Sequence, residues 1–319
     1  ATAIGEYEHD GYLPEAMSNF MVLLGWSLDD KTEIMSTQSI IDNFSLERIT
    51  KSAAIFDQEK LLWMNGMYIR EMTPEQLADH RAAADQLGRI VNEAFAYAGD
   101  HLAEGITEFQ VAEFIRERFA EEKIASPDGP IVAVNANASD PHYEPSVDRT
   151  SVIKQGDWLL IDLWAKGTAD GSVYADITWV AYVGDTVPER QQEIFNIVIG
   201  ARDAALNYLE DAHNQGIPVL GWQADQVARD FISSRGYGEY FTHRLGHSIG
   251  FEVHSEAVNL DGFETHDTRR LIPGVCFSIE PGIYLPEFGV RSEIDVFMSA
   301  DGPYASSPVQ HEVVLIKGG

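Results

Sequence analysis

Two aspartates lie inside apolar segments of the sequence, where an uncompensated charge would be costly. Asp162 is at the centre of residues 158–164, and Asp176 lies within residues 173–179. Residues 166–172 between them contain glycines and few apolar side chains, which predicts a hairpin connection. Adjacent antiparallel strands would bring both carboxylates together, and two like charges that close favour a bound cation. The alternatives are aspartates at strand ends and an aspartate paired with an arginine.

Histidines form a second group of residues that could do chemistry. His243, His247 and His254 fall within residues 243–254, a short stretch that also contains glycines. Imidazole supplies the nitrogen ligand of many transition-metal sites. A structural role remains the alternative for each of these histidines taken singly.

Two glutamates also lie in segments that we expect to be buried. Glu280 ends the apolar segment 275–280, and Glu293 lies within residues 289–298, which we expect to form one strand. A buried carboxylate without a partner is unfavourable. Four carboxylates and one histidine, each in an apolar or glycine-rich context, are therefore difficult to explain as surface salt bridges.

The segments that position these residues follow a repeated order of helices and strands. An N-cap at Thr73 and a capping-box pattern at Thr107 predict the first two helix starts. Two helices followed by strands, twice over, indicate a duplicated architecture, with chance similarity of amphipathic helices as the alternative. The expected helices cover residues 77–97, 107–122, 188–213 and 224–233. The expected strands cover residues 131–134, 158–164, 173–183, 275–280, 289–298 and 311–316.

The first quarter of the chain has a different character and predicts several short helices. It resembles the stem-contacting helical region of bacterial glutamyl-tRNA synthetases, because matching stretches occur at residues 11–16, 23–27, 51–57 and 63–66. Neither nucleotide-binding signature of a synthetase is present, so we do not expect this chain to charge tRNA. We expect residues 1–73 to act in packing or in contact with a partner, and RNA binding through them is a further alternative.

From about Leu77 onward, the sequence resembles the pita-bread metallopeptidases, which include methionine aminopeptidase, aminopeptidase P and prolidase. All five metal-ligand positions of that family can be matched in order. The resemblance implies an α+β pita-bread fold for residues 74–319, with duplicated halves of two helices and an antiparallel sheet, after a small helical segment at residues 1–73. It also implies two divalent metal ions, Mn or Co, with Zn and Fe as alternatives. The implied ligands are Asp162 on one metal, His247 and Glu280 on the other, and Asp176 and Glu293 bridging both.

The resemblance also implies roles for residues beside the metal ligands. His142 and His254 would contact the substrate and the developing oxyanion, and His243 matches an extra histidine of the branch that cleaves Xaa-Pro bonds. Arg291 would orient the neighbouring carboxylates, and Glu280 is the candidate proton shuttle to the leaving amine. We therefore expect an exopeptidase of Xaa-Pro type acting on peptides or dipeptides. Methionine aminopeptidase-like activity and non-catalytic peptide binding are the alternatives.

The sequence departs from the family pattern at several places. The connection between the two aspartates is longer than usual, Trp179 stands where many relatives carry arginine, and Ile294 replaces a residue that is often acidic. The usual N-terminal domain of prolidases is not recognised. These departures leave the substrate preference open and do not affect the predicted metal ligands.

Charge and composition limit the classes of partner. The chain of 319 residues has 22 Lys and Arg against 51 Asp and Glu, a formal net charge of -29, which disfavours nucleic acid and anionic lipid as partners. An ordinary acidic surface and adaptation to high salt both explain this excess. The single cysteine, Cys276, cannot form an internal disulfide, and neither a secretory signal nor a membrane span is visible. We expect a cytoplasmic protein without membrane contact, and a homodimer is an open alternative.

Overall fold

The chain divides into two compact units, residues 1–71 and residues 72–319. The computed structural model describes residues 7, 12, 14–29, 32–35, 37–50, 55–69, 72–255 and 257–318.

The first unit consists of short helices around a small apolar core. Phe20, Leu61 and Met64 form that core. Of the synthetase-like stretches, residues 11, 13 and 51–54 lie outside the described residues. The helices are α2 (Pro14–Leu23), α3 (Thr37–Asn43), the 3-10 turn η1 (Leu46–Arg48) and α4 (Gln58–Ile69).

The first half of the second unit is a pair of helices on a sheet. Thr107 forms the predicted capping box at the start of α6, and Thr73, predicted as an N-cap, also forms one at the start of α5. Each threonine hydroxyl accepts a hydrogen bond from the backbone amide of the glutamine three residues later. The strand order is β1-β3-β4-β11, with β2 also paired to β3, and β11 runs parallel to β4. The elements are α5 (Pro74–Asp100), η2 (Leu102–Glu104), α6 (Glu108–Glu122), β1 (Ile124–Ala125), β2 (Ile131–Val134), η3 (Asn135–Ser139), β3 (Trp158–Gly167), β4 (Ala175–Val183) and β11 (Val314–Ile316).

Alternation along β3 decides which side chains reach the interior between the two halves. Leu159, Ile161 and Leu163 belong to the core cluster under α5 and α6. Because successive strand residues point to opposite faces, Asp162 lies on the other face of the sheet. The same alternation in β4 puts Asp176 on that face, since its neighbours 175 and 177 belong to the helix-side cluster.

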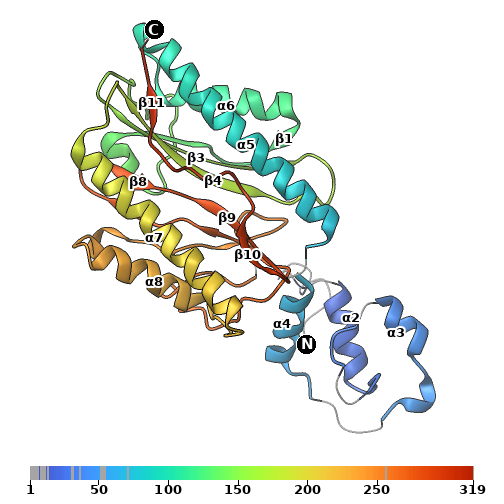
Figure 1. The fold of residues 1–319 in the computed structure, drawn as a ribbon. Coiled ribbons are helices and arrows are strands. Elements are labelled where there is room, and N and C mark those ends of the chain that lie inside the picture. Colours follow the sequence, from blue (N-terminus) through green and yellow to red (C-terminus); the bar gives the residue numbers. More distant parts are fainter. Residues whose placement is uncertain are drawn as a thin grey trace. The chain divides into compact units, whose positions relative to one another are not determined.

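The second half repeats the arrangement with less regular strands. Its sheet has the order β10-β9-β6-β5, a separate hairpin joins β7 to β8, and α7 and α8 pack against each other. In Figure 1 the strands of both halves lie between the helix pair α5–α6 and the helix pair α7–α8. The elements are α7 (Glu189–Asn214), α8 (Gly221–Ser233), η4 (Gly238–Tyr240), β5 (Ser248–Ile249), β6 (Cys276–Ile279), β7 (Gly282–Tyr284), β8 (Gly289–Arg291), β9 (Ile294–Ser299) and β10 (Gly302–Ala305).

The strand expected over residues 289–298 is wrong as a single element. The chain forms β8 and then β9, which belong to different sheets, because β8 pairs with β7 and β9 pairs with β6. The switch occurs at Ser292 and Glu293, so Glu293 lies between two strands and not within one. The expected strand over residues 311–316 is also shorter, as β11 begins at Val314.

Among the helices of the described residues, none combines the length and the apolar character that crossing a membrane would require.

Candidate metal centre

One pocket of about 370 Å³ collects all the residues that the sequence singles out for chemistry. Strands of the first half and loops of the second half both contribute to its wall. Its lining includes His142, Asp162, Asp176, His243, His247, His254, Glu280, Arg291 and Glu293.

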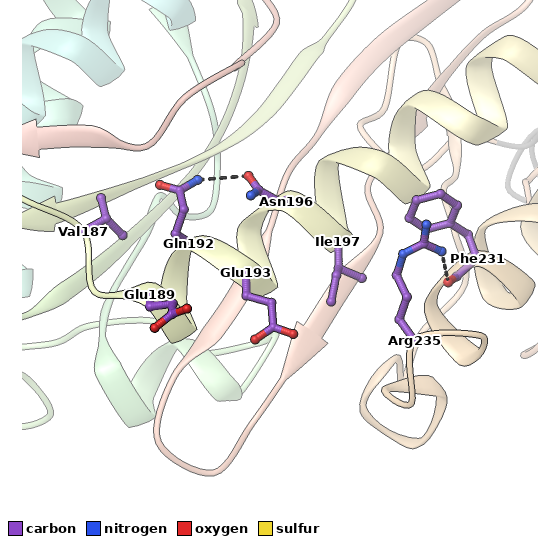
Figure 2. Close-up of a pocket in the computed structure, with 8 residues that line it drawn as sticks. All are labelled: Val187, Glu189, Gln192, Glu193, Asn196, Ile197, Phe231 and Arg235. Carbon is purple, nitrogen blue, oxygen red and sulfur yellow. Dashed lines mark hydrogen bonds between the residues drawn. The ribbon is translucent and has the colours of Figure 1, made fainter.

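A larger hollow of about 700 Å³ lies elsewhere, along α7 and the end of α8 (Figure 2). Its amide and guanidinium side chains are already bonded: Gln192 donates to Asn196 at 2.9 Å, and Arg235 donates to the carbonyl of Phe231 at 2.8 Å. Glu189 and Glu193 are its acidic lining residues, and both are exposed. This hollow lacks the buried clustered charges of the smaller pocket, so the smaller pocket is the candidate site.

The β3–β4 hairpin brings the two aspartates together as the sequence predicts. Asp162 pairs with Thr178 and Trp164 pairs with Asp176 in an antiparallel register. The two aspartates are therefore diagonal neighbours on one face of the sheet. Both side chains are nearly buried, with residue exposures of 9% and 5%.

His247 is fixed beside β6 by its own backbone and by a close approach of the chain. Its amide donates to Ser278 Oγ at 3.0 Å, and its carbonyl accepts from the Ser278 amide at 2.8 Å. A Cβ at the preceding residue, Gly246, would lie 1.9 Å from the Ser278 carbonyl oxygen, so only glycine allows this approach. Glu280 follows β6 directly, and its Oε1 lies 3.3 Å from His247 Nε2.

Glu293 is attached to the first half of the unit. Its amide donates to the Thr178 carbonyl at 3.2 Å, and the Thr178 hydroxyl donates to Glu293 Oε2 at 2.7 Å. Ligand atoms of Asp176, His247 and Glu293 all lie within 4.8 Å of one another. A single ion could therefore contact residues from both halves.

Three carboxylate oxygens in the pocket lack the partner that a buried oxygen normally has. Among the described residues, no hydrogen-bond donor reaches Oδ1 of Asp162, Oδ1 of Asp176 or Oε1 of Glu293. Unsatisfied carboxylate oxygens beside an imidazole are suitable donors for a divalent cation. The residues present therefore fit the metal ions that the resemblance implies.

Burial without a cation shifts the protonation of these groups toward their neutral forms. The pKa values of Asp176 and Glu293 are raised well above normal by burial and by the neighbouring carboxylates. Burial also raises the pKa of Glu280 to about 7, although Arg291 opposes the shift. Burial lowers the pKa of His247, so its imidazole is neutral and able to bind a metal.

Arg291 links several groups of the pocket. It donates from Nη2 to Asp162 Oδ2 at 2.5 Å, from Nε to the Thr178 hydroxyl at 3.1 Å and from Nη1 to the Tyr284 hydroxyl at 2.9 Å. The Tyr284 hydroxyl lies 2.7 Å from His243 Nε2, to which it can donate its own proton. These bonds hold Asp162 and His243 in fixed positions around one guanidinium.

Thr178 and Tyr284 are site residues that the sequence reasoning missed. A signal for Thr178 exists, because it lies two residues after Asp176 and so on the same face of the strand. Tyr284 lies four residues after Glu280, beyond the break between β6 and β7, and no periodicity of the sequence indicates its direction.

The two histidines expected to contact substrate occupy different surroundings. The His254 ring lies 4.2 Å from the His247 ring in an edge-on arrangement. His142 is exposed at the pocket wall, on a loop held by the buried carboxylate of Glu108. Glu108 accepts from the Tyr143 hydroxyl at 2.6 Å and from the Ser151 amide at 2.6 Å. The loop is therefore anchored at its base.

The chain is similar to two groups of known proteins, one matching its first unit and the other its second. Residues 1–63 match the catalytic domain of class I tRNA synthetases (E and Q). The chain is also 56% identical over 78 residues to a glutamate–tRNA ligase of Dehalococcoides mccartyi, an alignment that covers 24% of this chain and 16% of the ligase.

The larger part of the chain is similar to peptidases. It is 35% identical over 234 residues to an Xaa-Pro dipeptidase of Lactobacillus helveticus, which covers 72% of this chain and 58% of that relative. The crystal structure of an X-Pro aminopeptidase from Thermotoga maritima superposes with a TM-score of 0.66 at 26% identity, covering 86% of this chain and 74% of that one. The predicted pita-bread fold is confirmed by these structural neighbours. Because residues 82–300 match its sequence profile, the chain belongs to metallopeptidase family M24.

Proposed function

We propose that residues 72–319 form a dinuclear metal-dependent exopeptidase that releases the N-terminal residue from Xaa-Pro peptides or dipeptides. The observation that carries this proposal is the convergence of five ligand-type side chains, three with an unsatisfied buried oxygen, in one pocket. The chain spans about 58% of the length of the curated dipeptidase, so its activity is inferred from the site and not from that relative.

The proposed ligands divide between the two halves of the unit. Asp162 would serve one ion, His247 and Glu280 the other, and Asp176 and Glu293 both. Two divalent cations in such a site polarise the scissile carbonyl and activate a water molecule. We propose Mn or Co as the metals, because carboxylate-rich sites with one imidazole suit them, with Zn and Fe as alternatives.

The side chains of the pocket supply the proton transfers and the contacts to the substrate. Glu280, whose Oε1 lies 3.3 Å from His247 Nε2, would accept a proton from the attacking water and return it to the leaving amine. His254, whose pKa is lowered by burial and by Arg244, is a neutral imidazole that can donate a hydrogen bond to the developing oxyanion. His142, which is exposed at the pocket wall, would contact the substrate there.

The test is a hydrolysis panel with protein loaded separately with each metal. We expect Ala-Pro and Ala-Pro-Xaa peptides to be cleaved and metal analysis to give two ions per chain. Cleavage of Met-Ala-Ser in their place would support the methionine aminopeptidase alternative. Metal binding without hydrolysis of any peptide would support a non-catalytic role.

A matched pair of histidine variants locates the activity in this pocket. We expect His254→Leu to lower kcat on the order of 10²-fold, because it removes one oxyanion donor. His311 is exposed and does not line the pocket, so His311→Leu should retain the activity of the parent protein. Equal losses in both variants would contradict the assignment.

A further inference from the structure

One fully buried carboxylate lies outside the metal pocket and collects an unusual number of hydrogen bonds. Glu108 is 0% exposed and is the first residue of α6. Its Oε1 accepts from the Val134 amide at 2.7 Å and from the Asn137 side chain at 2.9 Å. Its Oε2 accepts from the Tyr143 hydroxyl and from the Ser151 amide, both at 2.6 Å. All four donors come from the chain between the end of β2 and the start of β3, so one carboxylate fixes this loop at four points.

The helix start that carries Glu108 is itself held in place. Thr107 forms the capping box of α6, and the Glu108 amide donates to the Ser151 carbonyl at 3.1 Å. The Phe109 amide donates to Thr150 Oγ1 at 3.0 Å. The following turn of α6 is buried in the core cluster of the first half. The carboxylate therefore extends from a rigid base, which is a requirement for orienting other groups accurately.

Tyr143 transmits this anchoring to the pocket wall. Burial, followed by the bond to Glu108, raises the pKa of the Tyr143 hydroxyl, which therefore remains a donor. The Tyr143 amide donates to the Asp140 carbonyl at 3.0 Å, and the amide of His142 donates to Asp140 Oδ1 at 3.1 Å. Among the described residues, no hydrogen-bond partner reaches the His142 ring. The place of this ring in the pocket therefore depends on the backbone that Tyr143 and Asp140 hold.

The second half of the unit contacts the same loop. A Cβ at Gly289, the first residue of β8, would lie 1.8 Å from the Ala138 carbonyl oxygen, and the Ser139 hydroxyl donates to the Leu285 carbonyl. The loop is therefore attached to Glu108 and also to the β7–β8 hairpin. Because the contacts to this hairpin do not involve Glu108, we expect loss of its carboxylate to shift the loop and not to unfold it.

We infer that Glu108 is a positioning residue for the substrate, acting on the reaction through His142 and not through the metal ions. Glu108 does not line the metal pocket, and its hydrogen bonds go to the loop that places His142 in the pocket wall. A displacement of about 1 Å in a group that contacts the substrate can lower the rate on the order of 100-fold. The inference rests on the proposed exopeptidase function.

The test is a double-mutant cycle between Glu108→Gln and His142→Leu on the cleavage of Ala-Pro. A glutamine cannot accept all four bonds, because its amide nitrogen is itself a donor. We expect each single variant to lower kcat/KM by about 10- to 100-fold, and the double variant to fall no further than His142→Leu alone. Mn affinity and stoichiometry should remain those of the parent protein. The matched control is Glu117→Gln, which changes an exposed carboxylate of α6 and should retain the kcat/KM of the parent.

Two results of the cycle would overturn the inference. If the losses multiply in the double variant, or if Glu108→Gln also loses Mn, the carboxylate supports the fold in general and does not act through His142. If Glu108→Gln does not fold, Tyr143→Phe takes its place, because it removes only one of the four bonds. Its smaller loss of kcat/KM should also disappear in the His142→Leu background, and a loss that persists there would contradict the inference.

Calorimetric binding of Ala-Pro to the Mn-loaded protein separates this inference from the proposed function. If Ala-Pro binds without being cleaved, the cycle is measured on its affinity, and non-additive losses support the inference although the proposed function has failed. If the parent protein cleaves Ala-Pro and either single variant cleaves it equally well, the inference is wrong while the exopeptidase function stands. If Ala-Pro neither binds nor is cleaved, both fail.

Discussion

The two halves of the catalytic unit supply their proposed ligands from different kinds of structure. In the first half, Asp162 and Asp176 lie inside β3 and β4, and the register of one hairpin sets their separation. In the second half, His247 precedes a two-residue strand, Glu280 follows β6, and Glu293 lies between β8 and β9. The first half therefore presents its ligands through regular secondary structure, and the second through strand ends.

This difference shows that the second half depends on the first for its geometry. Glu293 is bonded to the hydroxyl and carbonyl of Thr178, which belongs to β4. In return, Arg291 of the second half neutralises Asp162. The Asp176 amide donates to Asp295 Oδ2 of the second half at 3.0 Å, but the Asp176 carboxylate receives less, since the nearest His247 nitrogen is 3.7 Å from its Oδ2.

The largest predicted effects come from substituting the two aspartates of the first half, which should change the stability of the metal-free protein in opposite directions. Asp176→Asn should lower kcat/KM on the order of 10³-fold, as for loss of a contact that stabilises transition-state charge. The same change should stabilise the metal-free protein by about 1 kcal/mol, because it removes a buried carboxylate with an unsatisfied oxygen. Peptidase assays and urea unfolding after chelation measure both effects.

Asp162→Asn is the control, because it should lower both the activity and the stability of the metal-free protein. It should also abolish activity, but it removes the carboxylate to which the buried Arg291 is hydrogen-bonded and leaves only the 4.0 Å pair with Glu280, so the metal-free protein should lose about 3 kcal/mol of stability. Equal changes in the unfolding free energy of the two metal-free variants would show that Arg291 does not distinguish the aspartates.

The contrast between the halves also explains how much the sequence predicts. In the first half, an apolar run interrupted by one aspartate, a glycine-containing turn and a second such run predict the hairpin, and alternation predicts a common face for Asp162 and Asp176. The N-cap at Thr73 and the capping-box pattern at Thr107 predict the helix starts correctly. Local patterns suffice there because local hydrogen bonds determine the structure.

In the second half, the sequence indicates which residues line the pocket but not which strands surround them. The apolar pattern of residues 289–298 is that of one strand, because both β8 and β9 are buried. The break at Glu293 arises from pairing with two different partners, β7 and β6, and that pairing leaves no local trace in the sequence. The hydrogen bonds that link Tyr284 with Arg291, which donates to it, and with His243 cannot be predicted for the same reason.

The second prediction concerns pH and tests whether burial raises the pKa of the proposed carboxylate ligands in both halves. Metal binding requires ionised carboxylates, and the pKa of Asp176, Glu280 and Glu293 is raised in the metal-free pocket. Cations must therefore displace protons at pH values below about 7, the pKa of Glu280. We expect Mn affinity to increase by about 10-fold per pH unit for each proton released between pH 5.5 and 7. Calorimetry in buffers of different ionisation enthalpy counts those protons.

The stability of the metal-free protein should change with pH in the opposite direction. A carboxyl whose pKa is raised by folding holds a proton that the unfolded chain has already released, so stability falls as pH rises from about 4.5 toward 7. Glu280→Gln should reduce this fall. Metal binding without proton release, together with a stability that is constant across this range, would show that the carboxyls are ionised before the metal binds.

The smallest predicted effect concerns the bond between the halves. Thr178→Val removes the hydroxyl that donates to Glu293 and accepts from Arg291, while the shape of the side chain is nearly kept. We expect metal affinity to fall by about 10-fold, as for other residues that orient a metal ligand. Titration of the chelated protein with Mn measures the change, and kcat at saturating metal should fall less than affinity.

Thr178→Ser keeps the hydroxyl and therefore separates the hydrogen bond from packing. Restored affinity in the serine variant would mean that the bond itself positions Glu293, so the first half directs the geometry of the second. If both variants bind Mn as weakly as each other, the hydroxyl alone does not explain the loss, and the packing around residue 178 is responsible. If both bind like the parent protein, the backbone bond from Glu293 to the Thr178 carbonyl is enough to hold the carboxylate. In that case the second half would set its own ligand geometry, and the asymmetry between the halves would concern secondary structure alone.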